Sequence, residues 1–145
     1  DIRHYFRLGK YSAFANRLFA FSSSGQEPQR IYFGGSWSFR GYDRRSFYNR
    51  NVIFASNELR FPLIDNLYLG FSFGGIGFRG IRGALFFDTG SAWDDEFDKM
   101  LGSFGAGMRV SLGYIILLRF DFSRTTDFHT VSNTTDFDFF FGWNF

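Results

Sequence analysis

Hydrophobic and polar residues alternate most regularly at the C-terminal end of the chain. The odd positions there are all aromatic: Phe137, Phe139, Phe141, Trp143 and Phe145. The even positions are mixed: Asp138, Phe140, Gly142 and Asn144. A period of two predicts a β-strand with one apolar face. A soluble strand buries such a face under a second layer, whereas a membrane strand turns it to lipid. The high density of aromatic rings on this face favours a strand that faces lipid.

The same alternation predicts further strands, over residues 11–22, 51–61, 81–92, 102–112 and 114–122. Residues 1–8 are interpreted as the end of an earlier strand. Residues 61–66 are predicted to form a turn, followed by a Gly-rich stretch of ambiguous type over 67–78. Six or seven strands fall short of the eight that the smallest single-chain membrane barrels use. The missing strands are therefore expected upstream or on other chains.

Within these strands, residues at odd and even positions point to opposite faces of the sheet, so the parity of a position assigns its side chain to one face. The face assigned to the outside is apolar: Ile53, Ala55, Leu59, Phe61, Leu85, Phe87, Phe104, Met108 and Val110. The face assigned to the lumen carries most of the charge: Ser56, Glu58, Arg60, Arg82, Phe86, Asp88, Arg109, Arg119 and Asp121. An apolar exterior around a polar interior is the pattern of an outer-membrane barrel.

Composition supports the same fold class. Aromatic residues make up 23% of the sequence, with 24 Phe and only 2 Pro, and the mean hydropathy of −0.14 is close to neutral. No run approaches the roughly 18 apolar residues of a membrane-spanning helix. We therefore predict an all-β protein, the C-terminal six to seven strands of an antiparallel transmembrane β-barrel.

Charge and candidate chemistry narrow the function. The net charge of +2 comes from basic and acidic residues spread along the chain, which argues against nucleic acid as a partner. The acids Asp94, Asp95, Glu96 and Asp98 lack an ordered ligand pattern and are interpreted as a solvated turn. His4 and His129 are interpreted as ordinary polar positions, and residues 22–25 and 74–77 as flexible loop material. No catalytic residue, metal site or cofactor is predicted, and the chain is not expected to be an enzyme.

Three long or polar connections, residues 23–50, 93–101 and 124–134, are assigned to the extracellular side, where outer-membrane barrels carry their longer loops. The first, at about 28 residues, is too long to serve only as a connection. It contains the segment Gly34-Gly35-Ser36-Trp37-Ser38-Phe39-Arg40-Gly41-Tyr42. A function is therefore expected for this loop.

Phe39-Arg40-Gly41-Tyr42 resembles the loop motif of the Omp85 superfamily, which includes barrel-assembly proteins, two-partner secretion transporters and surface-antigen D15 proteins. Phe39 stands where Val or Leu is commoner. Further segments follow in the order of that family, at residues 57–62, 83–90 and 105–109. The chain also ends in a pattern similar to the C-terminal signal of outer-membrane barrels: Phe137, Phe139, Phe141, Gly142 and Phe145.

The resemblance implies that the loop folds into the lumen and that Arg40 meets Asp88 and Glu58 on the inner wall, with Phe86 nearby. A solvated arginine in a surface turn is the alternative. It also implies that residues 1–145 are the C-terminal portion of one barrel domain of sixteen strands, with the last strand at 135–145. The chain starts at Asp1 and shows neither an initiator Met nor a signal peptide, so it is expected to be mature or part of a longer protein.

The function implied by the resemblance is insertion or translocation of proteins at the bacterial outer membrane. The expected partners are outer-membrane lipid, unfolded outer-membrane or secreted proteins, and periplasmic or lipoprotein accessory subunits. The last strand would meet the first at a weak seam, where Gly142 would permit a kink. Two alternatives stay open: a passive porin, and a barrel that anchors or exports a fused passenger. Upstream sequence would separate the three.

Overall fold

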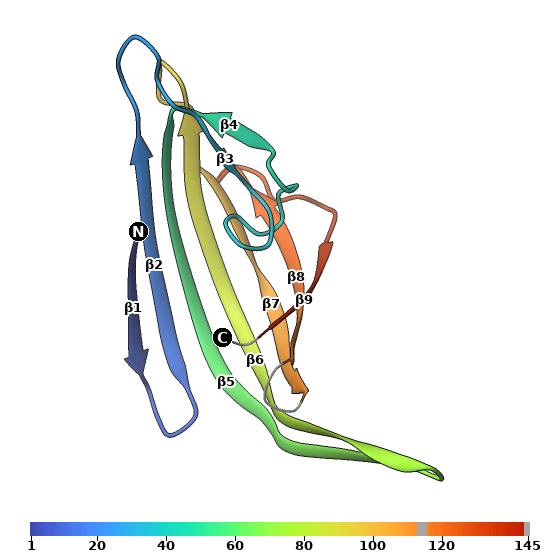
Figure 1. Ribbon diagram of the computed structural model, residues 1–145. Coiled ribbons are helices and arrows are strands. Elements are labelled where there is room, and N and C mark those ends of the chain that lie inside the picture. Colours follow the sequence, from blue (N-terminus) through green and yellow to red (C-terminus); the bar gives the residue numbers. More distant parts are fainter. Residues whose placement is uncertain (113–115, 144–145) are drawn as a thin grey trace.

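The computed structural model describes residues 1–112 and 116–143, and its strands form a curved sheet (Figure 1). The side chains of Arg79, Leu112, Ile116 and Trp143 are not among those described. The strands are β1 (Ile2–Arg7), β2 (Ala13–Ser22), β3 (Ile31–Phe33), β4 (Phe47–Asn49), β5 (Asn51–Phe71), β6 (Gly74–Trp93), β7 (Leu101–Leu112), β8 (Ile116–Thr126) and β9 (Asp136–Trp143). Among the described residues, no helix is long and apolar enough to cross a membrane.

Seven strands form one antiparallel sheet in the order β1-β2-β5-β6-β7-β8-β9. Each strand pairs with its predecessor along the chain, except that β3 and β4 form a separate hairpin between β2 and β5. This small hairpin and its loop lie on the concave side of the sheet (Figure 1). The all-β antiparallel prediction is therefore confirmed, and the described strands form an open, curved wall.

The two faces of the wall differ as the alternation predicts. Large apolar side chains are exposed on the outer face: Leu18, Ile53, Leu85, Phe87, Phe104, Met108, Phe122, Phe137, Phe139 and Phe141. The buried side chains of the inner face include Glu58, Phe86, Asp88 and Asp121. Val110 shares the parity of the exposed Met108 yet is only 6% exposed, because parity fixes the direction of a side chain and its neighbours decide how far it is covered.

The turn predicted at residues 61–66 is wrong. β5 continues to Phe71, and the strand connection lies at residues 72–73 instead. Pro62 has no N–H to donate to the β-ladder, and the pairing of β5 with β6 shifts register between Pro62 and Ile64. The bulge accommodates the proline without ending the strand. The glycines of residues 74–77, interpreted as flexible loop material, begin β6.

Beyond the bulge, β5 and β6 form a hairpin that projects past the neighbouring strands (Figure 1). The last partner of β2 on β5 is Arg60, whereas β5 and β6 stay paired as far as Phe71 and Gly74. This hairpin and the long loop of residues 23–50 lie at opposite ends of β5. The ambiguous stretch over 67–78 is thus the end of a long hairpin.

Other boundaries differ by a few residues. The strand predicted from 11 begins at Ala13, and the one predicted at 114–122 is β8, which ends at Thr126. Of residues 1–8, interpreted as the end of an earlier strand, Ile2–Arg7 form β1, which pairs with β2. Tyr114 and the two terminal positions Asn144 and Phe145 lie outside the described residues. Predictions for those positions stay predictions.

Candidate functional site: a loop held on the inner wall by Arg40

The loop of residues 23–50 is closed at its base. The Ser23 N–H donates to the Arg50 carbonyl at 3.1 Å. Asp94, which directly follows β6, accepts from the Arg50 N–H at 2.9 Å and from the Arg30 guanidinium at 3.0 Å. The Arg50 backbone hydrogen bond, aided by Arg30, lowers the pKa of Asp94. Asp94 therefore fastens the base of the loop, while its side chain stays 32% exposed and that of Asp95 87% exposed, in keeping with a solvated turn.

An aromatic cluster attaches the loop to the sheet. Phe39, the first residue of the motif, is 1% exposed and packs with Phe33 of β3 and with Val52 and Phe54 of β5. The ring centroids of Phe33 and Phe54 lie 5.1 Å apart in an edge-on arrangement. Buried rings in such arrangements stabilise by area and by geometry. Phe33 and Phe39 therefore anchor the loop in a core on the concave face.

Gly41 brings the motif close to β8. Its φ of 79° lies in the left-handed region, which side chains with a Cβ rarely adopt. A Cβ at this position would lie 3.0 Å from Ser123 Oγ and 3.0 Å from Thr125 Cγ2. Conformation and space both select glycine, which explains the residue that follows Arg40.

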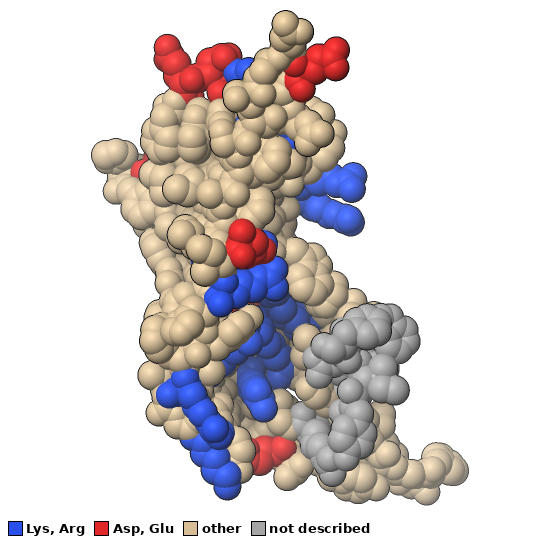
Figure 2. Space-filling view, turned by 60° about the vertical axis from the view of Figure 1, so that its left-hand side comes forward, with Lys and Arg blue, Asp and Glu red and all other residues tan. Residues whose placement is uncertain are grey.

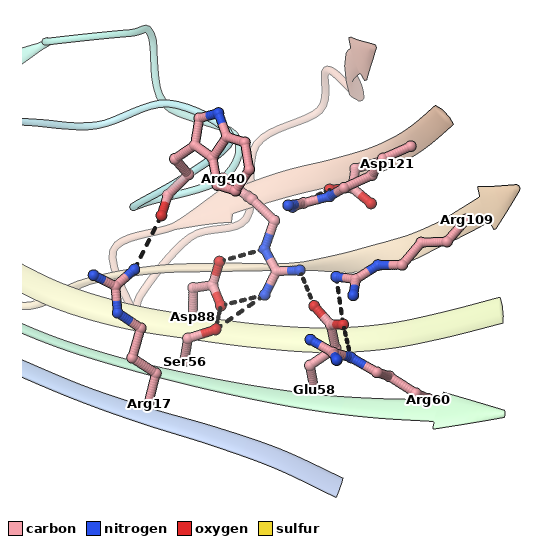
Figure 3. Close-up of polar contacts among 10 residues, drawn as sticks. Arg17, Arg40, Ser56, Glu58, Arg60, Asp88, Arg109 and Asp121 are labelled. Atoms are coloured by element: carbon pink, nitrogen blue, oxygen red, sulfur yellow. Dashed lines mark hydrogen bonds and ion pairs between the residues drawn. The ribbon is translucent and has the colours of Figure 1, made fainter. Parts of the chain in front are cut away.

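Arg40 binds three side chains of the inner wall (Figure 3). Its Nε and Nη2 donate to the two oxygens of Asp88, each at 2.7 Å. Its Nη1 donates to Glu58 Oε2 at 2.7 Å, and Nη2 also reaches Ser56 Oγ at 3.0 Å. The Arg40 and Asp88 side chains are 4% and 0% exposed. This is a bidentate, charge-assisted contact in a site closed to solvent.

An aromatic ring covers one face of the Arg40 guanidinium. The guanidinium carbon lies 3.6 Å from the centroid of Phe86, within the range of a cation–π contact. Burial alone lowers the pKa of Arg40, but the hydrogen bonds and charge of Asp88, together with Glu58, outweigh it and raise that pKa above its usual value. Arg40 therefore stays charged in its pocket.

The structure brings together Arg40, Asp88, Glu58 and Phe86, as the motif and the strand parity implied. Phe137, Phe139 and Phe141 lie exposed on the outer face of β9. Gly142 is buried, and a Cβ there would lie 2.4 Å from the Phe140 ring. Beyond the kink expected at Gly142, the structure thus gives this glycine a second role, which is to leave room for a neighbouring ring.

Several contacts of the site have no signal in the sequence. The Trp37 ring meets Phe140 of β9 edge-on at 4.5 Å, so the loop touches the last strand. Tyr42 Oη donates to the Gly102 carbonyl at 3.2 Å. Both contacts join residues distant in sequence, and no motif or alternation signals such pairs.

The two histidines lie apart from this site. The His4 ring packs edge-on against Phe6 at 4.0 Å on β1. The exposed His129 donates its N–H to Asp127 in the connection between β8 and β9. Among the described residues, no group of three or more His, Cys, Asp and Glu is placed to hold a metal ion.

A curved antiparallel sheet with an aromatic outer face, a charged inner face and a long loop held on that inner face defines the wall of a β-barrel protein. A model of the Omp85 superfamily domain matches residues 15–145, and the chain therefore belongs to the Omp85 superfamily. Members of this superfamily are generally β-barrels embedded in bacterial outer membranes. No curated protein and no solved structure matches the chain.

Proposed function

We propose that this protein inserts other proteins into the bacterial outer membrane or translocates them across it, and that it does so without catalytic residues or a cofactor. The observation that carries the proposal is the bidentate contact of Arg40 with Asp88 in a chain of the Omp85 superfamily. A buried guanidinium with two carboxylate partners fixes the loop in one position. A passive channel does not require such a device.

The position of the loop supports this proposal over a porin. The loop packs on the concave face through Phe39 and reaches β9 through Trp37. Such a loop occupies space that an open channel leaves to water, and it links the Arg40 site to the final strand. In the proposed mechanism the loop keeps the wall in order while a client strand forms at the seam beside β9.

The partners follow from this mechanism. The exposed rings of the outer face fit the lipid of the outer membrane. The clients are unfolded outer-membrane or secreted proteins, and periplasmic or lipoprotein accessory subunits would deliver them. We assign the protein to the assembly and secretion branches of the superfamily as a group, which contain the barrel-assembly proteins, secretion transporters and surface-antigen D15 proteins.

The test uses the full-length protein reconstituted in lipid vesicles. A urea-denatured outer-membrane barrel is added as client, and its folding is followed by the change in gel mobility before and after heating. We expect faster client folding than in empty vesicles, and a loss of this gain in Arg40→Ala. Arg124→Ala, which removes a charge from an exposed position of β8, is the matched control.

Two results would overturn the proposal. Rapid swelling of the vesicles in small solutes without any effect on client folding would identify a porin. Export of a fused upstream domain, again without client folding, would identify a barrel that carries its own passenger.

A further inference from the structure

Three arginines lie side by side across the inner wall. Arg82 of β6 is directly opposite Arg109 of β7, and Arg109 is directly opposite Arg119 of β8. Like charges in direct cross-strand register destabilise a sheet. We call Arg82, Arg109 and Arg119 the arginine row. The three like charges therefore lower the stability of the sheet unless anions compensate them.

The carboxylates of the wall neutralise the row only in part. Glu58 binds Arg109 at 2.5 Å, but it also binds Arg60 and Arg40 at 2.7 Å each, so one carboxylate serves three guanidinium groups. Asp88 is already engaged by Arg40.

Asp121 pairs with Arg119, and Arg109 keeps a buried Nε without a hydrogen-bond partner. The exposed Arg82 has no carboxylate partner among the described residues. Positive charge is therefore in excess along the row.

A cavity beside the row is large enough for a ligand. It has a volume of about 430 Å³, and Arg109 and Arg119 line it together with Arg60. Its remaining wall includes Tyr5, Trp37 and Phe140, which supply aromatic surface. Figure 2 shows Lys and Arg side chains gathered in a hollow of the molecule. The cavity thus combines guanidinium donors with rings, which suits carboxylates carried on a chain with apolar groups.

We propose that the arginine row binds an acidic segment of a client polypeptide inside the lumen, through side-chain carboxylates. This inference rests on the proposed function, which brings polypeptides to the lumen. Adjacent strands are about 4.8 Å apart, so the row spans about 10 Å. Carboxylates on one face of an extended peptide recur at about 6.8 Å, so acids at alternate positions reach two members of the row. Arg40 and Asp88 show the carboxylate fork that such a contact would repeat.

The experiment measures binding of a fluorescent ten-residue peptide of alternating Glu and Ser to the full-length protein in detergent, by anisotropy. The matched probe replaces every Glu by Gln. We expect binding of the Glu peptide that weakens with salt, and little binding of the Gln peptide. Arg82→Gln should weaken Glu-peptide binding by about tenfold, because one charge-assisted contact is lost. Arg124→Gln, on the outer face of β8, should leave it unchanged.

Stability separates a ligand site from a structural role. Arg82→Gln removes a like charge opposite Arg109, so its resistance to denaturant should equal or exceed that of the wild type. A loss of binding in a variant that is not destabilised supports the site. Equal binding of the Glu and Gln peptides, or an Arg82→Gln variant with wild-type affinity, would overturn it.

Inorganic phosphate serves as a second probe. If phosphate displaces the Glu peptide only at concentrations far above that of the peptide, the result supports a polypeptide ligand. Phosphate binding that depends on Arg82, without binding of the Glu peptide, would refute the polypeptide assignment. Failure of the client-folding assay with intact Glu-peptide binding counts against the proposed function. Intact client folding without Glu-peptide binding counts against the arginine row alone.

Discussion

Gly105 of β7 lies directly opposite Phe86 of β6, and a Cβ at Gly105 would lie 2.7 Å from the Phe86 ring. It would also lie 2.0 Å from the Phe122 carbonyl oxygen. Glycine here allows the ring to lie close to the β7 backbone, and the Arg40 guanidinium packs on that ring. Gly105 of β7 thus supports the contact between Arg40 of the loop and Phe86 of β6.

We expect Gly105→Ala to lower the free energy of unfolding by about 1–3 kcal/mol, because the added methyl group overpacks a close backbone contact. It should also loosen the loop by displacing Phe86. Gly77→Ala is the control, since a Cβ there has its nearest neighbour at 3.9 Å. Denaturant unfolding of the full-length barrel in lipid measures both variants. Equal stability of the two would contradict the role assigned to Gly105.

Deleting Phe145 should impair assembly of the protein itself. The motivation is the aromatic face of β9, on which Phe137, Phe139 and Phe141 are all exposed, together with the terminal signal that this sequence resembles. The level of folded full-length protein in the outer membrane is the measurement, and deletion should reduce it severalfold. Removing a residue from the exposed stretch at 128–130 is the control. Wild-type levels and folding rates without Phe145 would rule out a signal role.

The inner face of the wall could be predicted from sequence because strand periodicity is a local property. The alternation alone assigns Glu58, Phe86 and Asp88 to the lumen, and each is buried there. Arg40 required the motif, since nothing in the alternation of the strands tells where a loop residue points. The motif and the alternation together predict that Arg40 contacts Asp88.

Other features depended on information that a single segment does not hold. Pro62 favours a turn locally, but pairing of β5 with β6 continues past it through a bulge. The pairing of Gly105 with Phe86 depends on the register between two strands, which sequence alternation leaves open. Asp94 sits among acids that look solvated, and only the fold brings the Arg50 N–H to it.

Tyr42 should make the loop sensitive to alkaline pH. Burial, with a contribution from the charge of Asp127, raises the pKa of Tyr42 to about 12. An unfolded Tyr titrates near 10, so the folded state holds its proton more tightly. The contribution to stability is complete below pH 10 and is lost as pH rises towards 12. Tyr42→Phe should remove this part of the pH dependence, measured by proteolysis of the loop.

At neutral pH the same variant loses the hydrogen bond to the Gly102 carbonyl. We expect a modest destabilisation of about 0.5–1.5 kcal/mol, because one neutral hydrogen bond contributes that much. Tyr48→Phe, at an exposed tyrosine of β4, is the control. The same alkaline response in wild type and Tyr42→Phe would assign the effect to another group.

The contact of Arg40 with Asp88 should show strong coupling in a double-mutant cycle. Removing Arg40 leaves Asp88 as an uncompensated buried charge, whereas removing Asp88 leaves Arg40 with Glu58 as its one remaining carboxylate. Breaking a buried ion pair on one side costs about 3–5 kcal/mol. Arg40→Ala and Asp88→Ala should each destabilise the barrel and expose the loop to protease. The double variant should lose less than the sum of the two, by about 1–3 kcal/mol, because the second change removes a charge already without its partner.

Arg40→Lys sharpens this test, since lysine keeps the charge but lacks the planar fork that meets both oxygens of Asp88. We therefore expect Arg40→Lys to fall between the wild type and Arg40→Ala in stability and in protection of the loop. Full rescue by lysine would show that charge alone holds the loop. Strictly additive effects in the cycle would show that Arg40 and Asp88 act independently despite their contact.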